Sequence, residues 1–369
     1  MDDTNFPNYL LSQSIKDKID YFRNYTLVHP LLEQIYEDLS HLIKYSAPGS
    51  LIFLYGPSGV GKTTLIQKLY KDIVEETYPE LLENPAKLPA VLTRAVASDT
   101  STFNWKDYFQ RLLIETNDFL PAKMASDNRW EKIQLQNSQM LKTNNTSSSN
   151  YRKAVENTIK YRKPSIIFID EAQEIGMVST SRKLLRQTNV IKSLAEETQI
   201  NYVLSGTYEL LPLRNLNGQL SRRSLEVHFP RYDASNIEHR KIFRTVLRTF
   251  QNHLPLEQTP DLVSHWEYIF ERSIGCIGTV KDWLTRSYSW SLKKNRQTLT
   301  LEDLEKREPS IAQSLRKLEE ILEGENKLKI GEEERQKLRH GLGLDISEEL
   351  LCPQNKSWVY GSKQAMINL

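Results

Sequence analysis

The chain has 369 residues, a formal net charge of +2, 39% hydrophobic and 26% charged residues, a composition typical of a globular protein with two or three domains. No apolar run reaches the roughly 18 residues that a membrane-spanning helix needs. The two cysteines exclude a disulfide framework, and the polar N-terminus lacks the features of a secretory signal, so we expect a cytoplasmic protein with no membrane partner. The balanced charge excludes a uniformly basic surface but leaves room for a local basic stripe.

The first 46 residues predict helices, because apolar residues recur at helical spacing from Ile15 and again from Leu31. Pro48-Gly49 interrupts that pattern. The apolar run 51–55 then predicts a buried strand, and a new helical pattern starts at Thr64. Between the strand and this helix stands the octapeptide Gly56-Pro57-Ser58-Gly59-Val60-Gly61-Lys62-Thr63.

This octapeptide matches the phosphate-binding loop in the strand–loop–helix setting that the motif requires. Its glycines let consecutive backbone N–H groups face one anion, and the following helix adds its positive N-terminal end. We therefore predict that residues 56–64 hold ATP. Lys62 is expected to reach the β- and γ-phosphates, and the Thr63 hydroxyl to bind Mg²⁺. The alternative is a glycine-rich turn without a ligand.

Further strands and helices alternate along the next 150 residues. The segment from Pro79 to Pro89 is interrupted by prolines and is expected to connect the helix to the second strand. The pattern then predicts a strand within 90–96, a helix from about 102, an exposed polar loop at 142–150, a helix at 151–161, a strand at 165–170, a helix at 181–198 and a strand at 201–207. Strands that alternate with helices indicate a parallel sheet between two layers of helices.

Two adjacent carboxylates, Asp170 and Glu171, follow the apolar strand 166–169. Ligands of open α/β sheets collect at the carboxyl ends of the strands. We predict that Asp170 orients the magnesium ion and that Glu171 polarises the water that attacks the γ-phosphate. The alternative is a pair of carboxylates that cap a helix.

Two further polar elements follow. Thr207, at the end of the next strand, is our candidate for contacting the γ-phosphate or the attacking water, ahead of its neighbour Ser205; the alternative is a polar turn residue. Arg222 and Arg223 precede the strand-like run 225–229 and suit an arginine finger that acts on the nucleotide of a neighbouring copy. A solvated turn or a DNA contact is the alternative for both arginines.

From residue 233 the pattern becomes helical, with Trp266, Phe270, Val280 and Trp283 among the expected core residues. A charged segment follows, in which Ser310 is placed to cap a helix. We therefore divide the chain as a helical segment, an α/β nucleotide-binding core, a helical lid and a charged, partner-binding tail: 1–46, 47–232, 233–300 and 301–369.

These elements together resemble an AAA+ ATPase, and the detail is similar to the TnsC/TniB transposition regulators, which are relatives of MuB. Four stretches carry the closer resemblance, which covers about residues 15–295: His29-Pro30, Phe103-Asn104-Trp105-Lys106, Ser205-Gly206-Thr207 and the segment 275–284. The resemblance implies a three-layer α/β AAA+ core with a C-terminal helical lid. One departure concerns the lid, where Gly278 is followed by Lys281 instead of the arginine found in many AAA+ lids.

The resemblance implies that the protein binds ATP and Mg²⁺ and assembles as a ring or helical filament on double-stranded DNA. It would link a targeting protein of the TniQ/TnsD type to a TnsB-like transposase in a bacterial cytoplasm, associated with the nucleoid when on DNA, and hydrolysis would disassemble it. The ATPase would be slow and stimulated by DNA or partners. Two alternatives stay open: an AAA+ signalling or defence switch that does not act on DNA, and a helicase- or clamp-loader-like motor.

Several basic clusters are candidates for contacting DNA. We favour those beside the polar loop, Lys142, Arg152 and Lys153, together with residues near Thr102. A second cluster, Arg240, Arg244 and Arg248, recurs at intervals of four and so shares one helix face. Clusters of this kind are more often a solvated surface than a phosphate contact. Weak phosphate contacts from each subunit suffice for tight DNA binding if many subunits of a filament contribute them together.

Overall fold

The computed structural model describes residues 6–84, 86–98, 102–118, 128–142, 146–177, 181–214, 224–329 and 332–344. The chain divides into two compact units, Met1–Leu322 and Glu323–Leu369. No helix in the described ranges is both long and apolar enough to cross a membrane.

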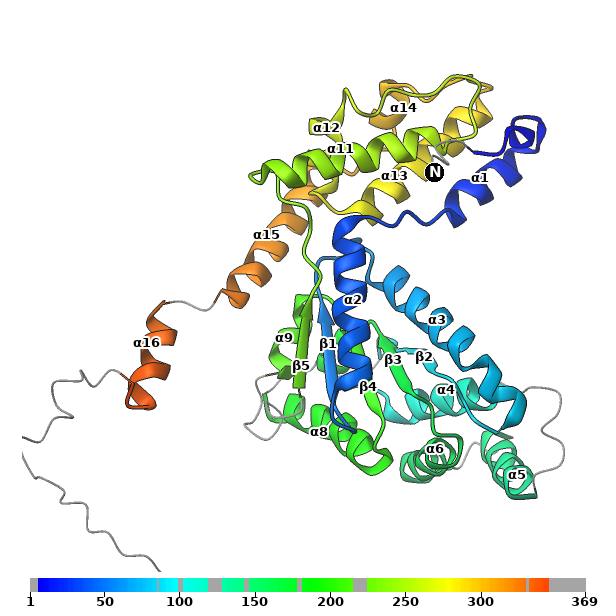
Figure 1. The fold of residues 1–369 in the computed structure, drawn as a ribbon, viewed down its shortest axis with the longest axis vertical. Coiled ribbons are helices and arrows are strands. Elements are labelled where there is room, and N and C mark those ends of the chain that lie inside the picture. The colour runs from blue at the N-terminus through cyan, green and yellow to red at the C-terminus, as the bar shows by residue number, and fades with distance from the viewer. Residues whose placement is uncertain are drawn as a thin grey trace, which may run out of the picture. The chain divides into compact units, whose positions relative to one another are not determined.

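A five-stranded parallel sheet forms the centre of the first unit (Figure 1). Its order is β2-β3-β4-β1-β5. The strands are β1 (Leu51–Tyr55), β2 (Val91–Arg94), β3 (Ile166–Asp170), β4 (Asn201–Gly206) and β5 (Ser224–His228). The three central strands β1, β3 and β4 are buried along their whole length, as expected of a parallel sheet covered on both faces.

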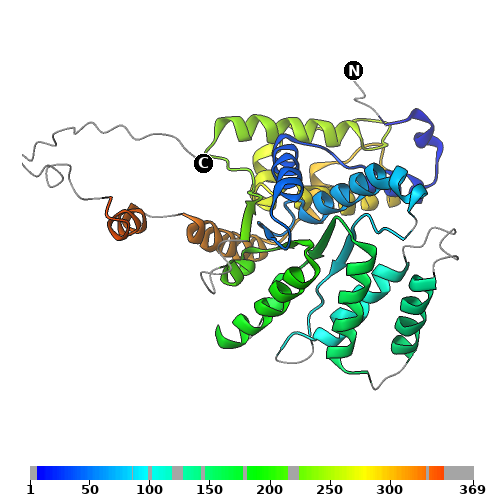
Figure 2. The ribbon, with the colours of Figure 1, turned by 60° about the horizontal axis from the view of Figure 1, so that its bottom comes forward.

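Helices cover both faces of this sheet (Figures 1 and 2). On one face, α2 (Pro30–Tyr45) and α3 (Lys62–Glu83) pack their apolar residues against Ile52, Leu54 and Phe168 of the strands. The other helices of the core are α4 (Trp105–Asp118), α5 (Asn128–Lys142), α6 (Ser148–Arg162) and α8 (Ser181–Thr198), with the short α7 (Gln173–Gly176), η2 (Tyr208–Leu210) and α9 (Leu211–Arg214). The predicted three-layer α/β fold is confirmed.

Two local predictions were wrong at their boundaries. Residues 148–150 belong to α6 and not to an exposed loop, because the Ser147 side chain accepts a hydrogen bond from the Asn150 N–H and starts the helix there. Similarly, α3 continues through Pro79 to Glu83, whereas we read the segment from Pro79 as a connection to the second strand.

A helical lid with its own core follows the sheet. It contains α11 (Ile237–Asn252), α12 (Trp266–Ser273), α13 (Ile277–Lys293) and α14 (Leu301–Glu305). Its core buries Phe270, Val280 and Trp283, as the sequence pattern predicts, whereas the predicted Trp266 is only partly buried against it. Phe22 of the N-terminal helix α1 (Ile15–Asn24) is buried in the same core. A short 3-10 helix, η1 (Asn8–Ser12), precedes α1.

The helix α15 (Ile311–Leu328) follows the lid, and its start is capped as predicted, because Ser310 Oγ accepts from the Gln313 N–H at 3.2 Å. Within the first unit, Lys317 of α15 donates to Thr279 Oγ1 of α13 at 2.8 Å. The described part of the second unit holds the end of α15 and the helix α16 (Glu332–Gly341).

Candidate nucleotide site

The loop after β1 adopts a wrapped backbone that only glycine tolerates at several positions. Gly59 and Gly61 have φ values of +76° and +120°, in the region that residues with a side chain rarely enter. A Cβ at Gly56 would lie 2.1 Å from the carbonyl oxygen of Phe229. The α3 helix begins at Lys62, directly after Gly61, so its unpaired N–H groups are presented at the loop.

Lys62 is buried inside this loop. Its Nζ donates to the carbonyl oxygens of Gly56 and Pro57, each at 2.8 Å. Burial lowers the pKa of Lys62 to about 8, against the opposing effect of the nearby carboxylates Glu171 and Asp170. A desolvated ammonium held by two neutral carbonyls is placed to exchange them for phosphate oxygens.

The next residue, Thr63, joins the loop to the acidic end of β3. Thr63 Oγ1 donates to Asp170 Oδ2 at 2.8 Å. A hydroxyl and a carboxylate oxygen this close together are the hard oxygen donors that Mg²⁺ prefers. The donor set therefore fits the predicted magnesium site, in which Thr63 and Asp170 would hold the ion or its water shell.

Glu171 has a left-handed backbone, with φ of +52°, an uncommon conformation for a residue with a side chain. Its Oε2 accepts a hydrogen bond from Gln173 Nε2 at 2.5 Å. Its Oε1 lies 3.8 Å from Nη2 of Arg94, at the end of β2. Both carboxylate oxygens of the predicted catalytic glutamate therefore have polar neighbours from this chain.

Thr207 lines the same cavity as Lys62 and Glu171, whereas Ser205 is fully buried in β4. The Thr207 N–H donates to Gln173 Oε1 at 3.3 Å, and its hydroxyl accepts from the Glu209 N–H at 3.4 Å. Of the two polar residues considered at the end of this strand, the structure thus brings Thr207 to the cavity.

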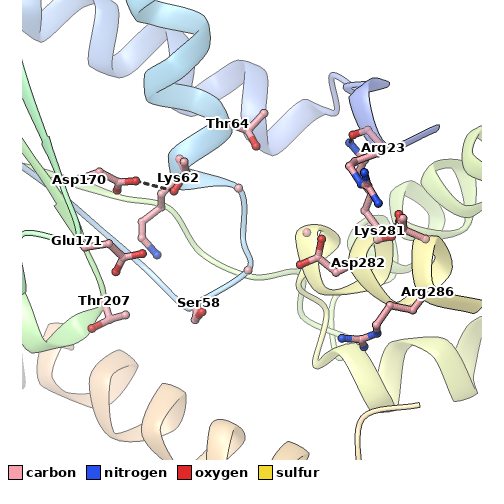
Figure 3. Close-up of a pocket in the computed structure, with 15 residues that line it drawn as sticks. Arg23, Ser58, Lys62, Thr64, Asp170, Glu171, Thr207, Lys281, Asp282 and Arg286 are labelled. Atoms are coloured by element: carbon pink, nitrogen blue, oxygen red, sulfur yellow. Dashed lines mark hydrogen bonds between the residues drawn. The ribbon is translucent and has the colours of Figure 1, made fainter. Parts of the chain in front are cut away.

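The cavity has a volume of about 580 Å³ and is bounded by the phosphate loop, the ends of β3 and β4, α1 and the lid helix α13 (Figure 3). The lid touches the loop directly, because the Thr279 N–H donates to the Gly59 carbonyl oxygen at 3.2 Å. A Cβ at Gly278 would lie 2.7 Å from that same oxygen. Gly278 therefore permits the close approach of α13 to the phosphate loop.

The lid residue Lys281 lies at the edge of the cavity but is engaged elsewhere. Its Nζ donates to the carbonyl oxygens of Arg23 and Tyr25, at 2.7 and 2.5 Å, at the end of α1. Arg286, about one turn further along α13, also lines the cavity, and Figure 3 shows its guanidinium on the lid side. The lid thus brings an arginine to the cavity later in the helix than the position considered from the sequence.

Other predicted residues lie away from this cavity or outside the described residues. Arg222, Arg223 and the side chain of Lys142 are outside the described residues. Arg152 pairs with Glu156 at 2.7 Å and donates to Ser193 Oγ at 2.8 Å, and Lys153 is exposed on α6. Neither these two residues nor Thr102 lines the cavity.

Sequence reasoning missed Gln173 and Arg94, which both contact Glu171. The signal available for Gln173 was its position two residues after the acidic pair. The signal for Arg94 was a charged residue at the end of a predicted strand.

Comparison with known proteins bears directly on this part of the chain. Residues 47–213 match the family described as "AAA domain". This segment is similar to an AAA domain. It contains the phosphate loop, Asp170, Glu171 and Thr207, so the match covers all the core elements of the cavity.

An uncharacterised ATP-binding protein of Pyrococcus horikoshii is 25% identical to the chain over 209 residues, which are 55% of this chain and 60% of that protein. The chain thus matches less than two thirds of the length of this relative. The chain is similar in sequence over those residues to a protein described as binding ATP.

Solved structures with partial similarity include the Aeropyrum pernix ORC2 protein, with a TM-score of 0.47 and 14% identity over 79% of this chain and 72% of that one. A Walker-type ATPase of Pyrococcus abyssi has a TM-score of 0.45 and 15% identity over 83% and 76% of the two chains. At these values we base no functional conclusion on either structure.

Proposed function

We propose that the chain is a magnesium-dependent ATPase that binds and hydrolyses ATP in the cavity between the AAA domain and the lid. The observation that carries this proposal is the convergence of Lys62, the Thr63–Asp170 pair and Glu171 on one cavity beneath α13. A buried ammonium, a hydroxyl–carboxylate pair and a second carboxylate are the groups that phosphoryl transfer to water requires.

Each residue of the cavity has a separate role in the proposed hydrolysis of ATP. Lys62 and the N–H groups of the phosphate loop bind and orient the β- and γ-phosphates. A magnesium ion held by Thr63 and Asp170 would neutralise charge on the phosphate oxygens. Glu171 accepts a proton from the attacking water, and Thr207 orients the γ-phosphate or that water.

We further propose that the ATP-bound protein assembles on double-stranded DNA and regulates transposition by linking a targeting protein to a transposase. This step is supported by the resemblance of residues 15–295 to TnsC/TniB regulators. The structure adds one supporting feature: Gly278 and Thr279 of the lid contact the phosphate loop at Gly59. A nucleotide bound at the loop could therefore shift the lid directly. A shift of the lid would change the surface that contacts a neighbouring copy.

The test combines nucleotide, duplex DNA and imaging. The protein is mixed with ATP, a non-hydrolysable ATP analogue or ADP, with and without plain duplex DNA, and examined by electron microscopy and by ATPase assay. Rings or filaments on DNA that require ATP or the analogue support the proposal. ATP hydrolysis without DNA association in any nucleotide state would favour the switch that acts on another protein.

A further inference from the structure

A second hollow lies along α13, beyond the nucleotide cavity. Its volume is about 310 Å³, and its lining consists of four cations, two hydroxyls and one indole: Arg23, Arg286, Lys293, Arg307, Thr285, Ser289 and Trp290. No carboxylate lines it. We call these seven residues the lid basic pocket.

The charge in this pocket is largely uncompensated within the described part of the chain. Arg286 and Lys293 are exposed and form no ion pair among the described residues. The Arg307 guanidinium lies 4.4 Å from the centre of the Trp290 ring, a cation–π contact that holds the guanidinium without cancelling its charge. Arg23 alone has an acidic partner, Asp20, at 3.1 Å.

The pocket is continuous with the nucleotide cavity. Arg23, Thr285 and Arg286 line both, and the two hollows follow successive turns of α13. Figure 3 shows Arg23 and Arg286 on the lid side of the nucleotide cavity, opposite Lys62 and Glu171. A ligand in the lid basic pocket would therefore contact residues that also face the nucleotide.

We propose that the lid basic pocket binds the phosphodiester backbone of nucleic acid. Cations that converge without a carboxylate select a polyanion, and side-chain hydroxyls such as those of Thr285 and Ser289 are common donors to backbone phosphates. Trp290, half-buried between cations, adds an aromatic surface of the kind that lies against sugars and bases. Hydroxyls and an aromatic ring beside the cations match the phosphates, sugars and bases of a nucleic acid, so we favour nucleic acid over an acidic protein segment.

This inference rests on the DNA-binding part of the proposed function and locates it on the lid, away from Arg152 and Lys153. It also gives a physical link between the two ligands. Arg286 lines both hollows. A bound nucleotide that moves the Arg286 side chain would therefore change the positive charge that the lid basic pocket presents to DNA. DNA affinity would then depend on the nucleotide state.

The test removes only the charges that belong to the lid basic pocket and not to the nucleotide cavity. We would compare wild-type protein, the double variant K293Q/R307Q and a matched control, K44Q/K71Q, which removes two exposed lysines from the core helices α2 and α3. The measurement is fluorescence anisotropy of a labelled DNA duplex of about 30 base pairs in the presence of a non-hydrolysable ATP analogue, at 50 to 200 mM salt.

K293Q/R307Q is expected to bind the duplex at least about tenfold more weakly at 0.1 M salt. The slope of log affinity against log salt should fall in magnitude by about 1.8, because each lost phosphate contact contributes about 0.9. The control should keep the wild-type slope, and all three proteins should bind a fluorescent ATP analogue equally. As a second readout, DNA should quench tryptophan emission in wild-type protein and less so in W290F.

Three results would overturn the inference, and they are distinguishable. Wild-type protein that binds DNA while K293Q/R307Q binds it equally well would refute the lid basic pocket alone. Equal losses in both double variants would indicate general attraction instead of a site. Wild-type protein that binds ATP but no DNA would refute the DNA part of the proposed function as well, and loss of binding to poly-glutamate in K293Q/R307Q would then assign the pocket to an acidic protein segment.

Discussion

Gln173 joins the predicted catalytic glutamate to the end of the neighbouring strand. Its Nε2 donates to Glu171 Oε2 at 2.5 Å, and its Oε1 accepts from the Thr207 N–H at 3.3 Å. The amide is buried, and a Cβ at Gly206 would lie 2.3 Å from Gln173 Oε1. Because Gly206 has no side chain, the Gln173 amide fits at this place. The amide fixes the position of Glu171 relative to Thr207.

Replacing Gln173 with methionine should separate turnover from binding. Q173M keeps the length of the side chain but loses both hydrogen bonds, so Glu171 is held less closely. We expect kcat to fall about tenfold, a part of the roughly 10²- to 10⁴-fold that a positioned general base contributes. ATP affinity, which depends on the phosphate loop, should stay within about twofold. Steady-state ATPase kinetics and binding of a fluorescent ATP analogue provide the two numbers.

The matched control for this variant is Q258M, which replaces an exposed glutamine whose amide contacts Gln297. Q258M should behave as wild type in both assays. If Q173M hydrolyses ATP at the wild-type rate, Gln173 does not position Glu171.

Adding one methyl group at Gly278 should disturb the contact between the lid and the phosphate loop. The Cβ of G278A would lie 2.7 Å from the Gly59 carbonyl oxygen, so the start of α13 must move away. We expect ATP affinity to fall about tenfold, while the free energy of unfolding changes by no more than about 1 kcal/mol, because alanine favours the helix. Isothermal titration calorimetry and denaturant unfolding measure the two quantities.

Gly341, at the end of α16, offers a matched comparison because a Cβ there meets no atom within 4 Å. G341A should bind ATP as wild type does. Unchanged affinity in G278A as well would mean that the lid position does not affect the nucleotide.

His29 should make stability depend on pH below neutrality. Its Nδ1 accepts from the Leu32 N–H at 3.3 Å and lies 2.9 Å from the Tyr232 hydroxyl, and burial lowers the pKa of His29 to about 4. The unfolded chain, with an ordinary His pKa of about 6.5, binds the proton more tightly than the folded chain. Stability is therefore full above pH 6.5 and falls as the pH drops toward 4, by up to about 3 kcal/mol.

Denaturant unfolding between pH 7 and pH 4 tests this dependence, with H29N as the comparison. Asparagine keeps a side-chain oxygen that caps the start of α2 but does not titrate. H29N should lose less stability than wild type over this range. Parallel pH curves for the two proteins would assign the acid sensitivity to other groups.

Lys281 should stabilise the packing of α1 on the lid instead of binding phosphate. Its two hydrogen bonds satisfy the Arg23 and Tyr25 carbonyl oxygens at the end of α1. K281M should lower the free energy of unfolding by about 1 to 3 kcal/mol, since two charge-assisted hydrogen bonds are lost. A variant with full stability and greatly weakened ATP binding would instead make Lys281 a phosphate ligand.

The core of the fold and most of the nucleotide site follow from local sequence features. The run Leu51–Tyr55, the glycines of the loop and the Asp170–Glu171 pair are contiguous signals, and strand order places them at one edge of a sheet. For Gln173 the sequence offers only its position two residues after the acidic pair, which does not reveal its role. Its function depends on β3 and β4 being neighbours, which brings Thr207 to within one hydrogen bond of its amide.

The lid was predictable in composition but not in detail. Helical spacing identified Trp283 and Phe270 as core residues, yet spacing alone did not show that Lys281 faces the end of α1 or that Arg286 faces the cavity. Residues one or two turns apart on the same helix reach different neighbours, and those neighbours are set by tertiary packing.

The most direct test of the central claim is the affinity for ATP with magnesium, measured by calorimetry on wild-type protein, K62A and E171Q. Lys62 binds phosphate in this account, and Glu171 acts only on water. Wild-type protein and E171Q should therefore bind ATP with similar affinity, K62A should show no measurable binding, and only the wild type should release phosphate. Equal binding by K62A and wild type, or no binding by a folded wild-type protein, would contradict the claim that this cavity holds ATP.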